Sequence, residues 1–111
     1  MREKYKSAGL NYDIIREAFP DMEEYEDTAN YYLADEHFHE LGEFLENEDY
    51  GMAKDAVKGL YLLAQDLRMF PLYEKLLEVY EDLSYEIYGD VLQHYREMME
   101  VYEQIRSIFY V

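Results

Sequence analysis

A chain of 111 residues in which half of the side chains are hydrophobic fits a single domain with one core, and the absence of cysteine excludes disulfides and thiolate chemistry. The formal net charge of −16, from 26 acidic and 10 basic residues, disfavours nucleic acid as a partner, because phosphate binding relies on clustered lysine and arginine. The most apolar stretch, residues 60–64, is far shorter than a membrane-spanning helix. We therefore expect a cytoplasmic protein without a membrane segment.

The start of the chain shows no helical pattern. Residues 1–9 contain three of the ten basic residues, and we expect them to form a flexible arm outside a domain of residues 10–111. Asn11 is a residue type that caps helix N-termini, and it predicts a short helix that runs through Phe19. Pro20 is expected to end this helix.

A long acidic helix is predicted over residues 21–47. Asp21 can cap it, and Glu23 and Glu24 would lie near the positive end of the helix dipole. No basic residue occurs between Arg16 and Lys54, so this helix would present an anionic surface. Its apolar residues follow the spacing of a buried stripe at Tyr31, Ala34, Phe38, Leu41 and Leu45.

The segment from residue 50 to residue 69, called here the hub helix, is the most apolar helix candidate in the chain. Asp49 is its expected N-cap, and Pro71 is expected to stop it. Its predicted buried stripe consists of Tyr50, Ala53, Val57, Leu60, Ala64 and Leu67. The opposite, exposed arc consists of Gly51, Asp55, Lys58, Gly59, Leu62, Gln65, Asp66 and Met69. Glycine costs about 1 kcal/mol relative to alanine inside a helix, so Gly59 is either tolerated or retained for the close approach of another surface.

Two further helices are predicted over residues 72–88 and 90–109, with Gly89 as the C′ glycine of the first and Asp90 as the cap of the second. Their buried stripes are Leu72, Leu76, Val79, Tyr80, Leu83 and Ile87, and then Tyr95, Met98, Tyr102, Ile105 and Phe109. The pattern predicts an all-α antiparallel four-helix bundle with a short N-terminal helix. Its core is expected to include Phe38, Val57, Leu60, Leu76, Leu83 and Tyr102. Most of the fourteen tyrosines are expected at the core boundary, with their hydroxyls at the rim.

No catalytic or metal-binding pattern is complete. Dinuclear carboxylate sites in helical bundles need a Glu-x-x-His pair from each of two helices. Glu36 and His39 form one such pair, but Val91 stands three residues before His94. The sequence also lacks a phosphate-binding glycine loop and a serine beside a histidine. We therefore expect a protein that is not an enzyme and that has no cofactor or metal.

The order of the elements resembles the histidine-containing phosphotransfer (Hpt) domain of bacterial phosphorelays. The resemblance covers about residues 10–108 and is carried by NEDYGMAKDAVKGLYLLAQDLRMFPLYEKLLEVYEDL and GDVLQHYREMMEVYEQI. In that family the hub helix carries H-x-x-K-G, with the histidine as phosphoacceptor, the lysine near the phosphoryl group and the glycine giving a receiver domain room to approach. Asp49-Tyr50 before the helix, and Leu67 and Pro71-Leu72-Tyr73-Glu74 after it, match the pattern of the family.

Two alignment registers are open for the motif. Without gaps, Lys58 takes the place of the histidine, Tyr61 that of the lysine and Leu62 that of the glycine. With a small insertion, Lys58-Gly59 match the family directly and Asp55 replaces the histidine. Because neither register supplies a histidine, the resemblance implies the fold and the partner rather than phosphotransfer.

The main hypothesis is a non-catalytic, Hpt-like protein of bacterial two-component signalling. It would bind the receiver domain of a response regulator, or a related phosphorelay component, as a monomer or weak dimer. Two alternatives remain open: a phosphotransfer carrier that uses a histidine outside the motif, with His94 first among the candidates, and a helical scaffold or oligomerisation module unrelated to phosphorelays. The residues expected to contact the partner are Asp55, Lys58, Gly59, Tyr61, Leu62, Gln65 and Met69.

Overall fold

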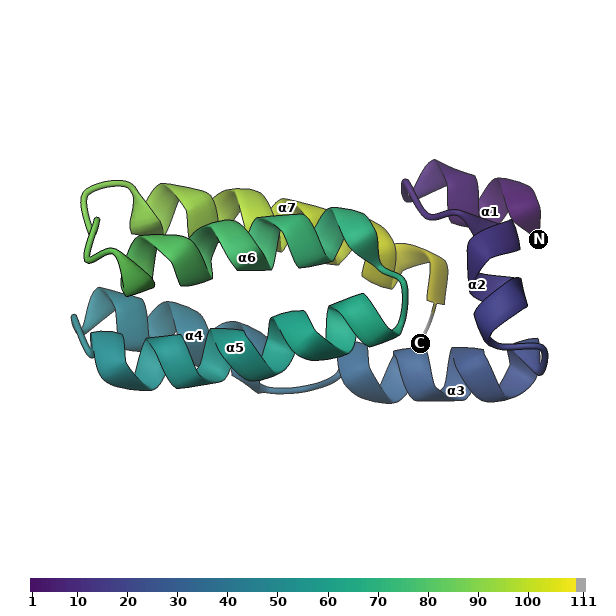
Figure 1. Cartoon of the computed structure of the whole chain (residues 1–111), viewed down its shortest axis with the longest axis horizontal. Coiled ribbons are helices and arrows are strands. Elements are labelled where there is room, and N and C mark those ends of the chain that lie inside the picture. Colours follow the sequence, from purple (N-terminus) through teal and green to yellow (C-terminus); the bar gives the residue numbers. More distant parts are fainter. Residues whose placement is uncertain (110–111) are drawn as a thin grey trace.

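The computed structural model describes residues 1–109, and every regular element in this range is an α-helix (Figure 1). The helices are α1 (Arg2–Ser7), α2 (Tyr12–Ala18), α3 (Met22–Leu33), α4 (His37–Glu46), α5 (Tyr50–Asp66), α6 (Phe70–Ser84) and α7 (Val91–Phe109). The prediction of an all-α chain is confirmed. None of the described helices has both the length and the apolar character needed to cross a membrane.

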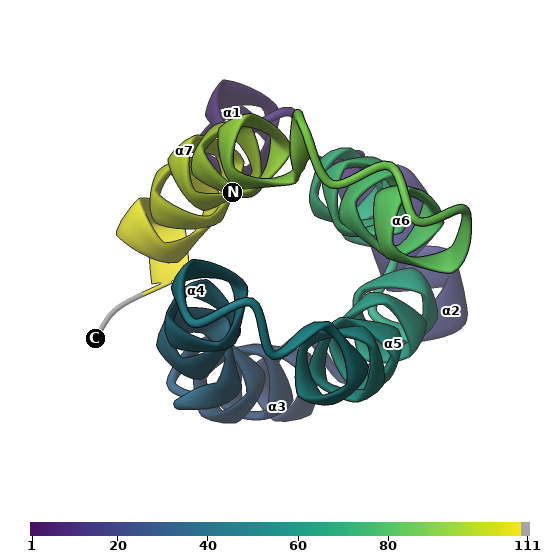
Figure 2. The same cartoon turned by 90° about the vertical axis from the view of Figure 1, so that its left-hand side faces the viewer.

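The longest helices lie side by side and give the molecule an elongated shape of 40 × 20 × 19 Å. Helix α5, the hub helix, packs against α4 and α6, α6 also packs against α7, and α7 contacts α3 and α4. In the end-on view, α4, α5, α6 and α7 surround a common centre in that order (Figure 2). Helix α3 extends beyond α4 toward the end of the molecule that carries α1 and α2 (Figure 1).

The prediction of one helix over residues 21–47 is wrong, because α3 ends at Leu33 and α4 begins at His37. The buried residues of α3 are Tyr25, Ala29, Tyr32 and Leu33, and those of α4 are Phe38, Leu41, Gly42 and Leu45. An unbroken helix that buried the first set would turn Glu36, Glu40 and Glu43 toward the core. The break shifts the helical phase, so that α4 buries apolar residues instead. Tyr31 and Ala34, expected in the buried stripe, are exposed as a result.

The first nine residues differ from the expected loose arm. They contain helix α1, and its Tyr5 side chain is fully buried against the rings of Tyr12 and Phe109, with centroids 5.3 and 5.5 Å away. Gly9 ends this helix at a φ of 77°, and the N–H of Leu10 donates to the carbonyl of Tyr5. The start of the chain therefore covers one end of the core.

Three predicted N-caps are confirmed. The side chains of Asn11, Asp21 and Asp49 accept backbone N–H groups in the first turns of α2, α3 and α5, at 3.1, 3.1 and 3.5 Å. Pro71 lies inside the first turn of α6, where its missing N–H costs no hydrogen bond. Helix α7 begins directly after Asp90.

Helix α6 ends earlier than predicted, at Ser84, and Gly89 does not close it. The left-handed residue at this helix end is Glu86, with a φ of 56°. Ile87 follows it outside the helix and is 54% exposed, so its predicted burial is wrong.

The six residues named as core are all buried, with at most 4% of their surface exposed: Phe38, Val57, Leu60, Leu76, Leu83 and Tyr102. Several tyrosines lie deeper than the expected boundary, because their hydroxyls donate to backbone carbonyls inside the molecule. These bonds run from Tyr25 to Leu67 (2.6 Å), from Tyr32 to Leu60 (2.6 Å), from Tyr95 to Phe38 (2.8 Å) and from Tyr102 to Leu33. The carbonyls of Leu33 and Leu67 lie at helix ends, where no intrahelical donor is available to them.

Candidate functional site

The exposed side of α5 carries most of the residues predicted to contact a partner. Asp55, Lys58, Gly59, Leu62 and Gln65 are exposed, and Tyr61 is half-buried. Tyr61 turns toward α6, where its ring packs edge-on against those of Tyr73 and Tyr80. Tyr61 is therefore a packing residue at the edge of this surface.

Met69 is not part of the exposed surface, because its side chain is fully buried. Helix α5 ends at Asp66, and Arg68 then adopts a left-handed conformation with a φ of 59°. The N–H of Met69 donates to the carbonyl of Ala64 at 2.9 Å, which fixes the chain reversal and turns Met69 inward. The exposed arc predicted from 100° per residue does not extend past the end of the helix.

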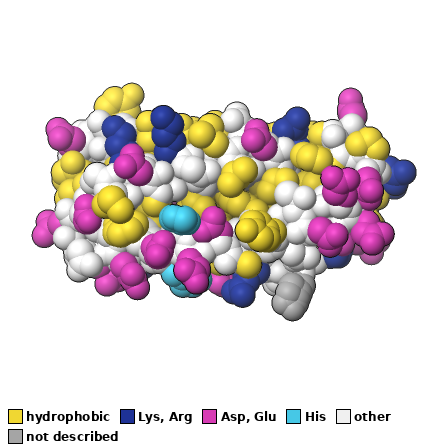
Figure 3. Space-filling model, turned by 90° about the horizontal axis from the view of Figure 1, so that it is seen from below, with side chains coloured by type: hydrophobic (Ala, Val, Ile, Leu, Met, Phe, Trp, Pro, Cys, Tyr) yellow, Lys and Arg dark blue, Asp and Glu magenta, His cyan; other side chains and the backbone are white. Residues whose placement is uncertain are grey.

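Three large apolar side chains remain uncovered on α5. Met52, Leu62 and Leu63 are 51, 44 and 46% exposed. Single exposed apolar residues are common on protein surfaces, but three on one helix form a candidate contact surface. Viewed from below Figure 1, this side of the molecule shows hydrophobic side chains between acidic ones (Figure 3).

A groove of about 490 Å³ lies between α5 on one side and α4, with the turn that precedes it, on the other. Its lining consists of Asp35, His37, Glu40, Phe44, Met52, Asp55, Ala56, Gly59, Leu60 and Leu63. The lining combines apolar side chains with His37 and with three carboxylates, those of Asp35, Glu40 and Asp55. Of the residues expected to contact a partner, the structure brings Asp55 and Gly59 into this groove, whereas Lys58 and Leu62 lie outside its lining.

Met52, Leu63 and Phe44 are groove residues that the sequence analysis missed. Met52, Ala56, Gly59 and Leu63 follow one another at spacings of four, three and four, which places them along one side of a helix. This stripe lies next to the buried stripe of α5. Its spacing was the pattern in the sequence that could have predicted the groove residues of α5. Phe44 comes from α4, and its place opposite α5 depends on how the two helices pack.

Gly59 leaves the middle of this surface open. A β-carbon built on Gly59 would have no atom within 4 Å outside its own helix backbone. No other part of the described chain therefore requires a glycine here, and the space at Gly59 is accessible to another molecule. Internal packing therefore does not explain the glycine at this position.

Lys58 lies beside Gly59 as a cation without a carboxylate partner. Within residues 1–109 no ion pair involves Lys58, whereas Lys54, one turn earlier, lies over the ring of Tyr80 at 5.7 Å from its centroid. Leu62 follows Lys58 by four residues and lies next to it on the helix. The pair combines a positive charge with an exposed apolar side chain.

His37 lies at the start of α4 and lines the groove. The carboxylate of Asp35 accepts both the backbone N–H of His37, at 2.8 Å, and the ring Nδ1, at 2.6 Å. The hydrogen bond with Asp35 raises the pKa of His37 above its ordinary value. Its other ring nitrogen, Nε2, lies 3.8 Å from Oε1 of Glu40, so both nitrogens of His37 lie near carboxylates.

His94, the alternative phosphoacceptor, is surrounded by carboxylates. Its Nδ1 lies 2.5 Å from Asp82 and its Nε2 lies 3.3 Å from Glu78. The one lysine in this cluster, Lys75, is 3.8 Å from Glu78 and 3.7 Å from Glu97. A phosphoryl group on His94 would meet negative charge, so this environment opposes phosphotransfer.

Comparisons with known proteins identify no relative of this chain. No protein-family model matches the sequence, and neither a curated protein nor a solved structure shows significant similarity to the chain.

Proposed function

We propose that the chain is a non-catalytic docking protein, and that the exposed side of α5 together with the α4–α5 groove receives a protein partner. The observation that carries this proposal is the exposure of Met52, Leu62 and Leu63 on one helix, around the open space at Gly59. Exposed apolar side chains next to a groove are typical of protein interaction sites.

The partner we propose is a receiver domain of a phosphorelay, as the resemblance to Hpt domains implies. On this proposal α4 to α7 form an antiparallel four-helix bundle of the Hpt type, with α5 in the place of the helix that carries the phosphoacceptor. The packing of consecutive helices, and of α7 on α3 and α4, supports this arrangement. Receiver domains carry a cluster of acidic side chains around their phosphorylatable aspartate, and Lys58 would enter that cluster.

Charge complementarity restricts how the two proteins meet. Asp35, Glu40 and Asp55 line the groove and would repel an acidic cluster, whereas Lys58 and Leu62 lie outside the groove lining. The acidic cluster of the receiver would therefore meet α5 at Lys58, and its apolar side chains would fill the groove near Gly59. Leu62 would exclude water from the ion pair and strengthen it beyond that of an exposed pair.

Phosphotransfer is not part of the proposed function. The residues of α5 include no histidine, and the two histidines of α4 lie at exposed positions of a different helix. Binding of an unphosphorylated receiver would instead keep it from an active phosphotransfer protein.

A titration of purified receiver domains with variants of the full chain tests the proposal. Lys58→Glu is expected to weaken binding by about tenfold or more, because it replaces an attraction with a repulsion in a partly desolvated contact. Asp55→Asn is expected to strengthen binding, because it removes one repulsive carboxylate beside Lys58.

Lys6→Glu is the matched control, since it makes the same charge reversal on α1, at the far end of the molecule from the centre of α5 (Figure 1). The control variant should bind as the wild type does. Equal losses in the Lys58 and Lys6 variants would show an effect of net charge alone, and would remove Lys58 from the interface.

A further inference from the structure

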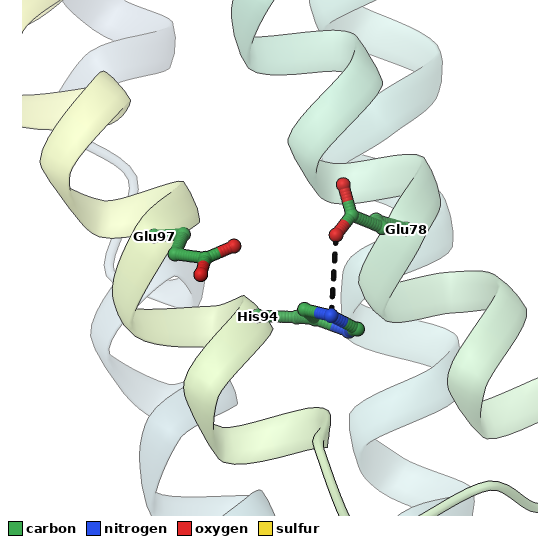
Figure 4. A group of neighbouring side chains, drawn as sticks. All are labelled: Glu78, His94 and Glu97. Atoms are coloured by element: carbon green, nitrogen blue, oxygen red, sulfur yellow. Dashed lines mark ion pairs between the residues drawn. The ribbon is translucent and has the colours of Figure 1, made fainter.

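A second cluster of polar side chains joins α6 to α7 (Figure 4). Glu78 and Asp82 come from one side of α6, one helical turn apart, and His94 and Glu97 come from the facing side of α7. Glu78, His94 and Glu97 each offer one atom that could bind a metal ion, and these three atoms lie within 4.8 Å of one another. The docking surface on α5 shares no residue with this cluster.

The imidazole of His94 is held in one orientation by a carboxylate from inside the molecule. Asp82 is only 9% exposed, and its Oδ2 lies 2.5 Å from Nδ1 of His94. A neutral imidazole that donates its Nδ1–H to Asp82 has the lone pair on Nε2, the nitrogen that faces Glu78. A carboxylate behind a histidine is the arrangement that orients metal-binding histidines in proteins.

The distances also suit a metal ion. Nε2 of His94 lies 3.3 Å from Oε1 of Glu78. Two ligands that each lie about 2.1 Å from a tetrahedral zinc ion are about 3.4 Å apart, so the separation of these two atoms matches that of two zinc ligands. Glu97 has to come closer, and its side chain is partly exposed and can change rotamer.

We propose that Glu78, His94 and Glu97 form a binding site for a divalent transition-metal ion, with zinc as the best match, and that Asp82 positions His94 for it. An imidazole ligand favours zinc or a neighbouring transition metal over calcium or magnesium, which prefer oxygen ligands alone. The three side chains leave a fourth position for water. Because the ligands come from two helices, the ion links α6 to α7.

Lys75 competes with the ion for the same carboxylates. Its ammonium lies 3.8 Å from Oε2 of Glu78 and 3.7 Å from Oε1 of Glu97, and so it balances part of their charge. A bound metal ion would displace this ammonium group. Removal of the lysine charge should therefore strengthen metal binding. If the cluster were only a set of structural ion pairs, the same change would weaken the cluster.

The test is a calorimetric titration of the full chain with zinc, in excess magnesium to saturate weak carboxylate sites, together with the absorption spectrum of the cobalt complex. The wild type should bind one zinc ion at this site. Its cobalt complex should show the absorption spectrum of a four-coordinate ion. His94→Gln should abolish this binding, and Asp82→Asn should weaken it by about 10- to 100-fold. Lys75→Met should strengthen it by about fivefold or more, the factor expected for removing one charge about 4 Å away in water.

His37→Gln is the control, because His37 also lies near two carboxylates, at 2.6 Å from Asp35 and 3.8 Å from Glu40, but on the exposed start of α4. This variant should bind zinc as the wild type does. Unchanged affinity in His94→Gln, or loss of binding in His37→Gln, would overturn the proposal. If His94→Gln fails to fold, weaker zinc binding by Lys75→Met would overturn it, and tighter binding with the four-coordinate cobalt spectrum would support it.

Discussion

Two glycines on neighbouring helices differ in whether the packing around them leaves room for a side chain. A β-carbon on Gly42 of α4 would lie 2.6 Å from the hydroxyl oxygen of Tyr95, which donates to the carbonyl of Phe38 at 2.8 Å. A β-carbon on Gly59 of α5 would touch nothing. Gly42 is thus needed for packing against α7, whereas Gly59 lowers the stability of its helix without any internal contact to explain it.

Alanine at these two positions should change stability in opposite directions. Gly42→Ala should lower the free energy of unfolding by about 1 to 3 kcal/mol, because Tyr95 has to move and its hydrogen bond is strained. Gly59→Ala should raise it by about 0.5 to 1 kcal/mol, because a helix interior favours alanine. Urea unfolding of both variants measures this difference. Destabilisation by Gly59→Ala would show that an internal contact fills the space at Gly59.

The buried tyrosine hydroxyls are a further test at the scale of single residues. Tyr25→Phe should cost about 1 to 3 kcal/mol of stability, because the carbonyl of Leu67 at the end of α5 loses its donor inside the molecule. Tyr31→Phe is the matched control, since Tyr31 is 86% exposed and should change stability by less than about 0.5 kcal/mol. Equal effects in the two variants would contradict the role of the buried bond.

At the scale of elements, three helix ends have the same construction. Glu48, Arg68 and Glu86 follow the ends of α4, α5 and α6 with φ values of 55°, 59° and 56°. In each case the next N–H bonds back to a carbonyl in the last turn: from Asp49 to Phe44, from Met69 to Ala64 and from Ile87 to Asp82. This is the Schellman motif, which usually has glycine at the left-handed position. Here charged residues occupy it, at some cost in stability.

Glycine should therefore stabilise these ends. Glu86→Gly is expected to raise the free energy of unfolding by about 1 kcal/mol, because it removes the strain of a side chain in the left-handed region. Glu74→Gly, the same change inside α6, should lower it by about 1 kcal/mol. Thermal or urea unfolding of the two variants gives the comparison, and a loss of stability in Glu86→Gly would contradict the assigned helix end.

The helix ends also explain which parts of the fold the sequence could predict. Side-chain N-caps such as Asn11 and Asp49 have a specific chemical signature, and their positions were predicted correctly. C-terminal ends with charged residues at the left-handed position have no such signature. The arcs predicted for α5 and α6 therefore ran past the true ends, which placed Met69 outside and Ile87 inside.

Two other features depended on tertiary packing. The break between α3 and α4 is visible in the sequence only through the three glutamates that an unbroken helix would bury. The cluster around His94 does not contain the Glu-x-x-His pattern, because His94 and Glu97 have the reverse order and Glu78 comes from another helix. The α4–α5 groove likewise arises from the packing of two elements, so only its α5 residues had a pattern to detect.

At the scale of the whole molecule, the buried tyrosines couple folding to high pH. Burial raises the pKa of Tyr25 and of Tyr32 well above the ordinary value. In the unfolded chain these groups lose their protons near pH 10, whereas the folded chain keeps them. The native state then binds more protons than the unfolded state, so stability falls as the pH rises above about 10.

The stability of the protein should therefore depend on pH in the alkaline range. Below about pH 9 the contribution of these tyrosines is constant, and above about pH 10 the urea midpoint should fall steadily. Tyr32→Phe should reduce the slope, because one of the coupled protons is removed. A urea midpoint that does not change between about pH 9 and 11 would contradict the burial of these hydroxyls.

The most direct test of the proposed docking function is an NMR titration of the full, isotopically labelled chain with the receiver domain that binds it most tightly. The proposal predicts that the largest changes in amide signals occur in α5, around Asp55, Lys58, Gly59 and Leu62, and along the facing side of α4. Signals of α1 and α2, at the far end of the molecule, should stay in place. Changes confined to the α6–α7 side or to α1 and α2, or the absence of binding by any receiver domain, would contradict the proposed docking function.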